Sequence, residues 1–305
     1  CFAISFSLAS CGSIHNSKSF SSKSELKSKA DEVIRPLSGR IKFLASKYNI
    51  YIEEQERTPE QEEAANDRES MYIVSNIANE YFQNQLFNGD EGRAIGLSYF
   101  KERGFREDTL KKFQLGYSPE KSDAFSAHAL KEGYKVEFLE KIGLTIPKES
   151  RNYDRFRGRV MFPIHSLSGR ILGFGGRILK SNVKAAKYLN SPESEIYSKS
   201  KVLYGMFQAK NSIVKKDRCL LVEGYTDVVS MHQSGIENVV ASSGTSLTVD
   251  QIKLVKRFTN NITLLFDGDA AGLKAALRGV NLILQEGLNV KVVTFPDGED
   301  PDSYA

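Results

Sequence analysis

Acidic residues in the last third of this chain follow the ends of apolar segments. Glu223 comes directly after the segment 219–222, and Asp267 and Asp269 come directly after 262–266. A further acidic group follows the segment 290–295: Asp297, Glu299, Asp300 and Asp302. Clustered carboxylates raise each other's pKa unless a cation neutralises them, so this pattern implies a bound cation. Oxygen ligands without His or Cys favour Mg²⁺, and the chemistry that fits is phosphoryl or nucleotidyl transfer.

The segments that carry these acids are predicted to form a parallel sheet. Apolar strands alternate with amphipathic helices, and this alternation is typical of a sheet covered on both faces. The expected strands are 219–222, 238–241, 262–266 and 290–295, and the expected helices are 225–233, 248–258 and 270–285. Ligands of such sheets bind beyond the carboxyl ends of the strands, where the acids fall. An isolated Asp-x-Asp is explained by a turn with Asx hydrogen bonds, but acids at the other strand ends favour a metal site.

The segment from Lys148 to Arg218 is strongly basic. It contains 16 Lys or Arg residues and five acids, whereas 219–305 contains 11 acids and six bases. A basic part followed by an acidic one suggests that a polyanion lies on the first while cations are held by the second. Within the basic part, 159–164 and 170–174 are predicted to form a hairpin through the turn Ser168-Gly169.

The chain upstream of this basic segment is predicted to begin with a tail. Nine serines and little apolar periodicity in residues 1–24 predict poor order. Helical spacing begins near Ile41, and Thr58-Pro59-Glu60 predicts the start of a long helix that ends at about Gln85. Residues 92–148 are predicted to form a small, mostly helical unit.

Both parts of the chain contain short motifs with a characteristic composition. The acidic part contains LVEGYTD (221–227), ASSGTSL (241–247) and FDGDAAG (266–272), followed by the acidic motif PDGEDPD (296–302). The basic part contains RFRGRVMFP (155–163), GFGGR (173–177), KYLNSPE (187–193) and LYG (203–205). These motifs resemble bacterial DnaG-type primases: the acidic part resembles their Toprim module, and the basic part resembles their RNA-polymerase core. The resemblance covers residues 41–305 and implies an α/β Toprim module, a parallel sheet flanked by helices, preceded by an α+β basic subdomain.

The resemblance also implies roles for individual residues. Glu223 would act as general base or metal ligand near the primer 3′ hydroxyl, and Asp227 would support it. The implied metal-binding aspartates, with Mg²⁺ or Mn²⁺ as the ion, are Asp267, Asp269, Asp300 and Asp302. The residues implied to meet phosphates of the template and the incoming nucleotide are Arg157, Arg159, Arg177, Lys187, Asn190 and Lys199.

The chain departs from this family at both ends. Cys1-Phe2 resembles the start of the last C-x-x-C pair of a zinc ribbon, but Ile4 stands where the second cysteine belongs, so no zinc is expected. We therefore expect a disordered or degenerate segment at 1–40, the N-terminal basic subdomain at 41–217 and a C-terminally truncated Toprim module at 218–305. The replicative helicase expected as a partner of this family would lack its binding region here.

The resemblance implies a primase: an RNA polymerase that makes short RNA primers on single-stranded DNA from ribonucleoside triphosphates. Two alternatives remain at this point, an inactive single-stranded nucleic-acid-binding fragment and a Toprim nuclease or topoisomerase fragment. No segment has the roughly 20 apolar residues that span a membrane, and three scattered cysteines in 305 residues do not make a disulfide scaffold. These features predict a cytoplasmic protein.

Overall fold

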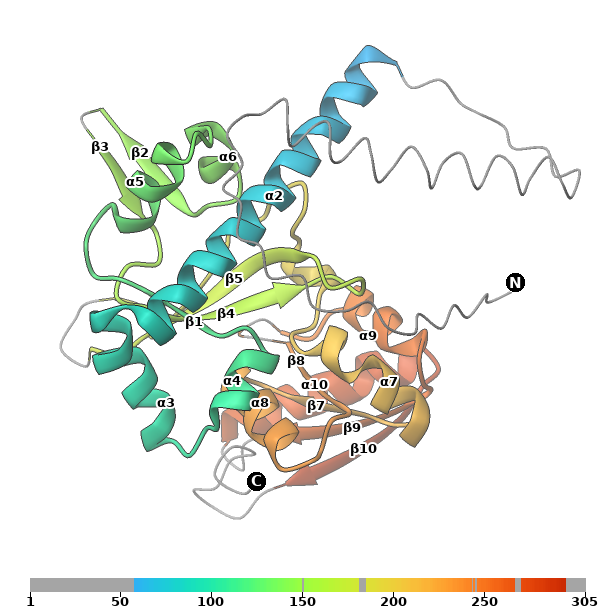
Figure 1. The fold of residues 1–305 in the computed structure, drawn as a ribbon. Helices are drawn as coiled ribbons and strands as arrows, with labels where there is room; N and C mark the ends of the chain where they lie inside the picture. Colours follow the sequence, from blue (N-terminus) through green and yellow to red (C-terminus); the bar gives the residue numbers. More distant parts are fainter. Residues whose placement is uncertain are drawn as a thin grey trace, which may run out of the picture. The chain divides into compact units, whose positions relative to one another are not determined.

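The structure is a computed structural model that describes residues 58–149, 151–180, 185–242, 244, 246–266 and 270–294, with only the backbone for 270–274 and 294. The chain divides into two units, 1–58 and 59–305, and the elements below belong to the second. Figure 1 shows their order along the chain. The predictions for residues 1–57, including the absence of zinc, lie outside the described residues.

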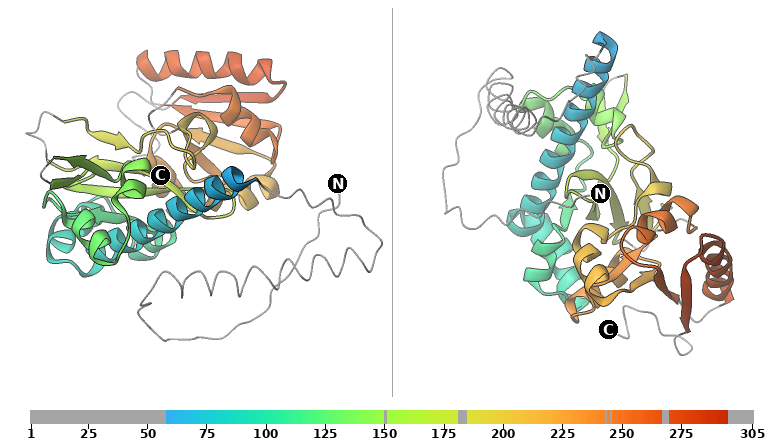
Figure 2. Two further views of the ribbon diagram at one scale, coloured as in Figure 1. Left: turned by 90° about the horizontal axis from the view of Figure 1, so that it is seen from above. Right: turned by 90° about the vertical axis from the view of Figure 1, so that its right-hand side faces the viewer.

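A long helix, α2 (Pro59–Asn88), starts where the sequence predicts and ends three residues later than expected. Pro59 occupies the first helical position, where its missing N–H needs no partner. The first three turns are mostly exposed. From Met71 onward buried side chains recur every three or four residues and form one apolar stripe: Met71, Val74, Ala78, Phe82 and Leu86. With this face α2 packs against β1 and β5, and Figure 2 shows the helix from two further directions.

The segment after α2 contains more strand than the sequence predicts. Its helical elements are the π-helical turn η1 (Gly92–Leu97), α3 (Ser98–Glu102), α4 (Glu107–Lys112), α5 (Ala124–Lys131) and α6 (Val136–Lys141). Its strands are β1 (Gly116–Ser118) and β2 (Thr145–Lys148), which pairs with β3 (Arg151–Asp154). The prediction of a mostly helical unit therefore missed β1 and β2. Both strands are short and lack the continuous apolar run by which strands of similar length in the acidic part were predicted.

The basic part is built on an antiparallel sheet with the order β1-β4-β5-β6. The predicted hairpin is confirmed: β4 (Arg159–His165) pairs with β5 (Ile171–Ile178), and Gly169 at the turn has a φ of 89°. The short strand β6 (Tyr188–Asn190), which the sequence analysis did not identify, pairs with the outer side of β5. After it come the 3₁₀ turn η2 (Lys199–Lys201) and α7 (Met206–Lys216).

The acidic part forms the predicted parallel sheet, with the order β10-β9-β7-β8. The strands are β7 (Cys219–Val222), β8 (Val239–Ala241), β9 (Asn261–Phe266) and β10 (Asn289–Thr294). The helices are α8 (Tyr225–Gln233), α9 (Val249–Lys256) and α10 (Ala270–Gln285). Alternate strand residues face opposite sides. Cys219 and Leu221 pack with α7, α9 and α10, whereas Val222 packs with α8.

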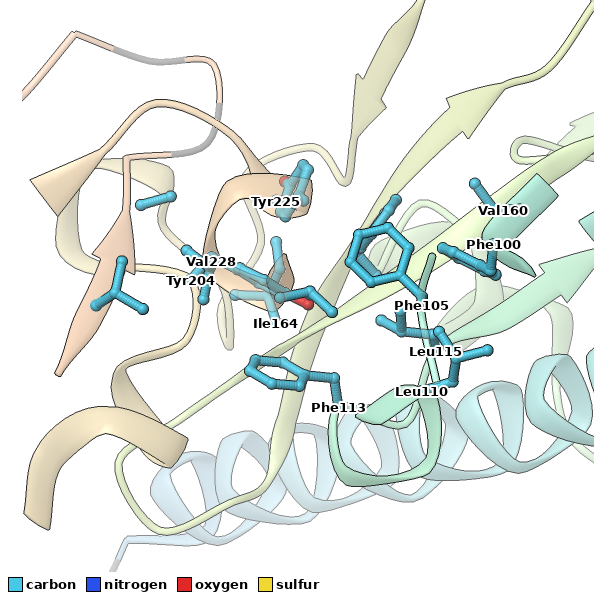
Figure 3. Packing of buried hydrophobic residues seen from close by; sticks show 14 of the residues in the cluster. Phe100, Phe105, Leu110, Phe113, Leu115, Val160, Ile164, Tyr204, Tyr225 and Val228 are labelled. Carbon is cyan, nitrogen blue, oxygen red and sulfur yellow. The ribbon is translucent and has the colours of Figure 1, made fainter. Parts of the chain in front are cut away.

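One hydrophobic core is shared by the two sheets. Phe162 and Ile164 of β4 lie in the same buried cluster as Tyr204, Tyr225 and Val228, and Figure 3 shows this packing from close by. The predicted boundary at 217/218 therefore separates two sheets whose buried side chains are continuous. In the described part of the chain no helix is long and apolar enough to cross a membrane.

Candidate active site

The carboxyl ends of the parallel strands lie level with one another. Thr294 at the end of β10 pairs with Phe266 at the end of β9, and Leu221 of β7 pairs with Leu264. Glu223 follows β7 at this edge. The metal-binding aspartates expected beyond β9 and β10, namely Asp267, Asp269, Asp300 and Asp302, lie outside the described residues. Among the described residues there is no group of three or more His, Cys, Asp or Glu side chains that could hold a metal.

Glu223 occupies the turn between β7 and α8 and is half-buried, with its Oε1 shielded from solvent. The turn is fixed by a neighbouring carboxylate, because Gly224 donates its backbone N–H to Asp227 Oδ2 at 2.8 Å. Asp227 lies in the first turn of α8, where a negative charge interacts favourably with the helix dipole. Asp227 thus holds the backbone next to Glu223, in keeping with the supporting role expected for it.

Tyr225 joins this turn to the basic sheet. Its hydroxyl donates a hydrogen bond to Asn190 Oδ1 at 2.7 Å, so Asn190 at the end of β6 lies beside the start of α8. The sequence analysis named Asn190 but gave Tyr225 no role. The only sequence signal for a role of Tyr225 was its position in the motif 221–227, two residues after Glu223. Packing in the hydrophobic core explains an aromatic residue at this position equally well.

The other expected phosphate-binding residues differ in how they are held. Arg157 is exposed in the turn before β4, and Lys187 is exposed just before β6. Lys199 is half-buried, its backbone N–H donates to Glu193 Oε1, and it lines a small pocket together with Asn190 and Ser242. Two exposed cations and a cation-lined pocket thus lie on or next to the antiparallel sheet.

Arg177 is held between two aromatic rings that the sequence analysis did not single out. Its guanidinium lies 5.1 Å from the ring centre of Tyr99 and 5.5 Å from that of Tyr188, and its Nη1 donates to the Tyr188 hydroxyl at 3.0 Å. Cation–π contact and a hydrogen bond restrict the guanidinium while its charge is retained. This arrangement holds the half-buried side chain of Arg177 in place.

Arg159 takes a position different from the one expected. It is 6% exposed, and its guanidinium donates to the backbone carbonyls of Gly176, Ala186 and Lys187. Burial lowers the pKa of its guanidinium from the ordinary value. A group that is enclosed and occupied by carbonyls does not present its charge to a phosphate. Arg159 instead holds the backbone just before β6 through its hydrogen bonds to the carbonyls of Ala186 and Lys187, and so helps to position Lys187.

Two family descriptions match the chain in succession. "DNA primase catalytic core, N-terminal domain" matches residues 81–210, and "Toprim-like" matches residues 220–305. The solved RNA polymerase domain of the Mycobacterium tuberculosis primase DnaG aligns with a TM-score of 0.72 at 33% identity, over 77% of this chain and 78% of that chain. The chain belongs to the DnaG-type primase family. The expected fold class, a Toprim module preceded by an α+β basic subdomain, is confirmed.

Two further members of this primase family show how much of it the chain represents. A curated DNA primase from Halalkalibacterium halodurans is 39% identical over 266 residues, which are 87% of this chain and 44% of that protein. The chain therefore spans less than half the length of this relative. A solved DnaG primase catalytic domain bound to single-stranded DNA aligns with a TM-score of 0.71 at 37% identity, over 79% of this chain and 77% of that chain.

Proposed function

We propose that this chain provides the RNA-polymerase core of a primase. In this function it synthesises short RNA primers on single-stranded DNA from ribonucleoside triphosphates. The proposal is supported by membership of the primase family and by the relative whose catalytic domain was solved with single-stranded DNA. We further propose the cytoplasm as the place of this activity, because the template and the nucleotides are found there.

The arrangement around Glu223 is the observation that carries this proposal. The turn that carries Glu223 lies at the carboxyl edge of the parallel sheet. Tyr225, at the start of α8, joins this turn to the antiparallel sheet through a hydrogen bond of 2.7 Å to Asn190. The carboxylate of Glu223 and the basic residues that we propose to bind phosphate therefore belong to elements joined by this hydrogen bond. Nucleotidyl transfer needs both, because a triphosphate must be bound while charge builds on the leaving pyrophosphate.

Glu223 and the acids that follow β9 and β10 in the sequence are of a chemistry that fits a hard divalent cation. Their ligand atoms are carboxylate oxygens, which Mg²⁺ and Mn²⁺ prefer. When bound, such an ion neutralises charge on the reacting phosphates. We propose that Glu223 accepts the proton of the primer 3′ hydroxyl or helps to hold the ion, and that Asp227 keeps the Glu223 turn in place. Asp267, Asp269, Asp300 and Asp302 are the further proposed ligands.

The basic residues are proposed to bind the two polyanions of the reaction. Arg157, Arg177 and Lys187 would contact the template strand or the triphosphate, and Asn190 and Lys199 would do so at the small pocket that they line. Arginine suits this role because its planar guanidinium grips a phosphate in two places. Arg159 is not among these contacts; its proposed part is to hold the backbone that carries Lys187.

The test is primer synthesis on a single-stranded template with Mg²⁺, comparing the chain with its Glu223→Gln and Asp267→Ala variants. Both substitutions remove a carboxylate that stabilises charge in the transition state, so incorporation of labelled nucleotide is expected to fall by about 100-fold or more. The matched control is Asp250→Asn, which changes an exposed acid at the start of α9 in the same module. This control is expected to retain full incorporation.

Two results would reject a primase core. Template binding without incorporation, unchanged by Glu223→Gln, would identify a nucleic-acid-binding fragment. Strand cleavage in the absence of nucleotides, lost in Asp267→Ala, would identify a Toprim nuclease. Incorporation that does not depend on Glu223 would leave the family membership intact but assign the chemistry to other residues.

A further inference from the structure

A hydrogen bond joins Tyr225 to Asn190. The tyrosine hydroxyl donates to the amide oxygen Oδ1 of Asn190 at 2.7 Å, a separation typical of O–H···O bonds. Since the oxygen and nitrogen of an amide point to different sides, this bond also fixes where the two N–H donors of Asn190 point.

We propose that Tyr225 is a positioning residue that orients the Asn190 amide, so that its N–H donors meet a phosphate oxygen of the bound template or nucleotide. This inference rests on the proposed function. A phosphate offers acceptors only, so an amide turned the other way would face it with its carbonyl oxygen and repel it. Tyr225 selects the orientation that binds.

Packing around Tyr225 holds its hydroxyl in one position. The side chain is 2% exposed, and its ring stacks on Phe162 at 5.0 Å and meets the edge of Tyr204 at 4.7 Å. Opposite Tyr225 the chain has a glycine, Gly175. A Cβ at that position would lie 2.3 Å from the tyrosine Cζ and 2.5 Å from its hydroxyl oxygen. The hydroxyl is thus positioned by the core before any ligand binds, and a group that is held in advance loses less entropy on binding.

Asn190 lies where an oriented donor can be used. It pairs with Gly175 at the end of β6, three residues after the exposed Lys187, and it lines the same small pocket as Lys199 and Ser242. Its partner Tyr225 begins α8, two residues after Glu223. The hydrogen bond therefore couples the strand that carries the phosphate-binding residues to the turn that carries the proposed general base.

The experiment compares Tyr225→Phe, Asn190→Ala and the double variant in the full chain. The phenylalanine keeps the packed ring and removes only the hydroxyl. Two binding arms distinguish the source of the phosphate: anisotropy of a labelled single-stranded oligonucleotide without nucleotide, and binding of ATP with Mg²⁺ without a strand. Thermal unfolding is recorded for each variant, so that a loss of fold is recognised.

A matched control is provided by Tyr204→Phe. Tyr204 packs against the same ring, and in the part of the chain that the structure describes its buried hydroxyl has no hydrogen-bond partner. Removing this hydroxyl is expected to leave both affinities unchanged. Any effect specific to Tyr225→Phe then comes from the bond to Asn190 and not from the loss of a buried tyrosine.

We expect Tyr225→Phe to weaken binding of one ligand by roughly three- to tenfold, the usual value of one hydrogen bond. Asn190→Ala should weaken binding of the same ligand at least as much. The double variant should be no weaker than Asn190→Ala alone, because the proposed effect of the tyrosine hydroxyl on the ligand passes through the amide. Wild-type affinity in Tyr225→Phe, penalties that multiply in the double variant, or a wild-type chain that binds neither ligand would overturn the inference.

The outcome is separable from that of the proposed function. Binding that depends on Tyr225 and Asn190 as expected, in a chain that incorporates no nucleotide, would support the positioning role while rejecting primer synthesis. Full incorporation with unaltered binding in Tyr225→Phe would do the reverse.

Discussion

The two sheets of this protein place their functional side chains by different means. In the parallel sheet, Glu223 is positioned by its own place in the sequence, one residue after β7 ends. In the antiparallel sheet, Arg157 and Arg159 are two residues apart, yet the first is exposed and the second is buried under carbonyls from Gly176 and Ala186. Where a strand of a parallel sheet ends is determined by neighbouring residues. Whether a charged residue beside a hairpin is exposed or buried depends on segments far away in the sequence.

The difference has an energetic meaning. A residue held by local structure can be exchanged with little effect on the rest of the fold, as long as its strand still ends at the same place. A buried arginine that donates to several carbonyls is part of the fold, because removing it takes one hydrogen bond away from each of those carbonyls. Two arginines of the same motif can therefore have different roles: Arg159 contributes to stability, whereas Arg157 is expected to contribute to binding.

The largest effect is expected from the pair of arginines. Arg159→Met should lower the free energy of unfolding by about 3 kcal/mol, because charge-assisted hydrogen bonds from a buried guanidinium to backbone carbonyls are lost while the hydrophobic stem is kept. Arg157→Ala should change it by no more than about 0.5 kcal/mol, as is usual for a surface position. Urea unfolding of both variants measures the contrast.

The same pair separates stability from binding. Arg157→Ala is expected to weaken single-stranded DNA binding and to reduce the slope of log affinity against log salt by about 1, the value of one phosphate contact. Equal stability losses in the two variants, or no change of salt slope in Arg157→Ala, would contradict the contrast between them.

A smaller effect is expected from two buried histidines, one in each sheet region. His165 Nε2 lies 3.0 Å from Gln114 Oε1, which also accepts from Asn79. Because an amide oxygen only accepts, the ring nitrogen of His165 is the donor. Burial lowers the pKa of His165 to about 4, and burial together with the nearby Lys112 lowers the pKa of His232 to about 4.

The sign of the pH effect follows from these values. Both histidines have folded pKa values below 6.5, so the unfolded chain takes up their protons first as the pH falls. Their contribution is fully present above pH 6.5 and is lost towards pH 4. We expect each to account for about 2 kcal/mol of this acid loss. Urea unfolding at pH 7, 5.5 and 4.5 should show a flatter profile in His165→Gln and in His232→Gln than in the wild type. If a substitution leaves the pH dependence of the free energy of unfolding unchanged, the replaced histidine is not buried in its neutral form.

The smallest effect is expected at the ion pair between α4 and the segment that follows α8. Lys112 Nζ lies 2.9 Å from Glu237 Oε1, but the two side chains are 50% and 43% exposed. Lys112→Ala should therefore cost about 0.5 kcal/mol or less, and the cost should vanish at high salt. The same substitution should raise the pKa of His232, because Lys112 lowers it. NMR titration of His232 measures this shift, and a pKa that stays unchanged would contradict the proposed electrostatic link.

Much of the parallel module was predictable, because its signals are local. The predicted bounds of β7, α8 and α10 agree with the structure, and β9 begins one residue earlier than predicted. Buried strands and amphipathic helices have distinct periods over four to sixteen residues. By contrast, β1 and β6 are three residues long and exist only because they pair with β4 and β5.

The candidate site shows the same division. The position of Glu223 follows from where a strand ends, and the family likeness of its motif was recognised from the sequence. The aromatic rings that hold Arg177 come from residues 78 positions before and 11 positions after it, and the hydrogen bond between Tyr225 and Asn190 spans 35 positions. No local pattern encodes such pairs, because their partners are brought together by packing.

The parallel sheet, the basic character of the preceding part and the likeness to primases could be predicted from the sequence, because hydrophobic periodicity and strand ends are properties of consecutive residues. Which basic residues face solvent, and which one is enclosed by backbone carbonyls, became visible only in the folded chain. Burial and hydrogen-bond partnership arise when elements far apart in the chain exclude water together.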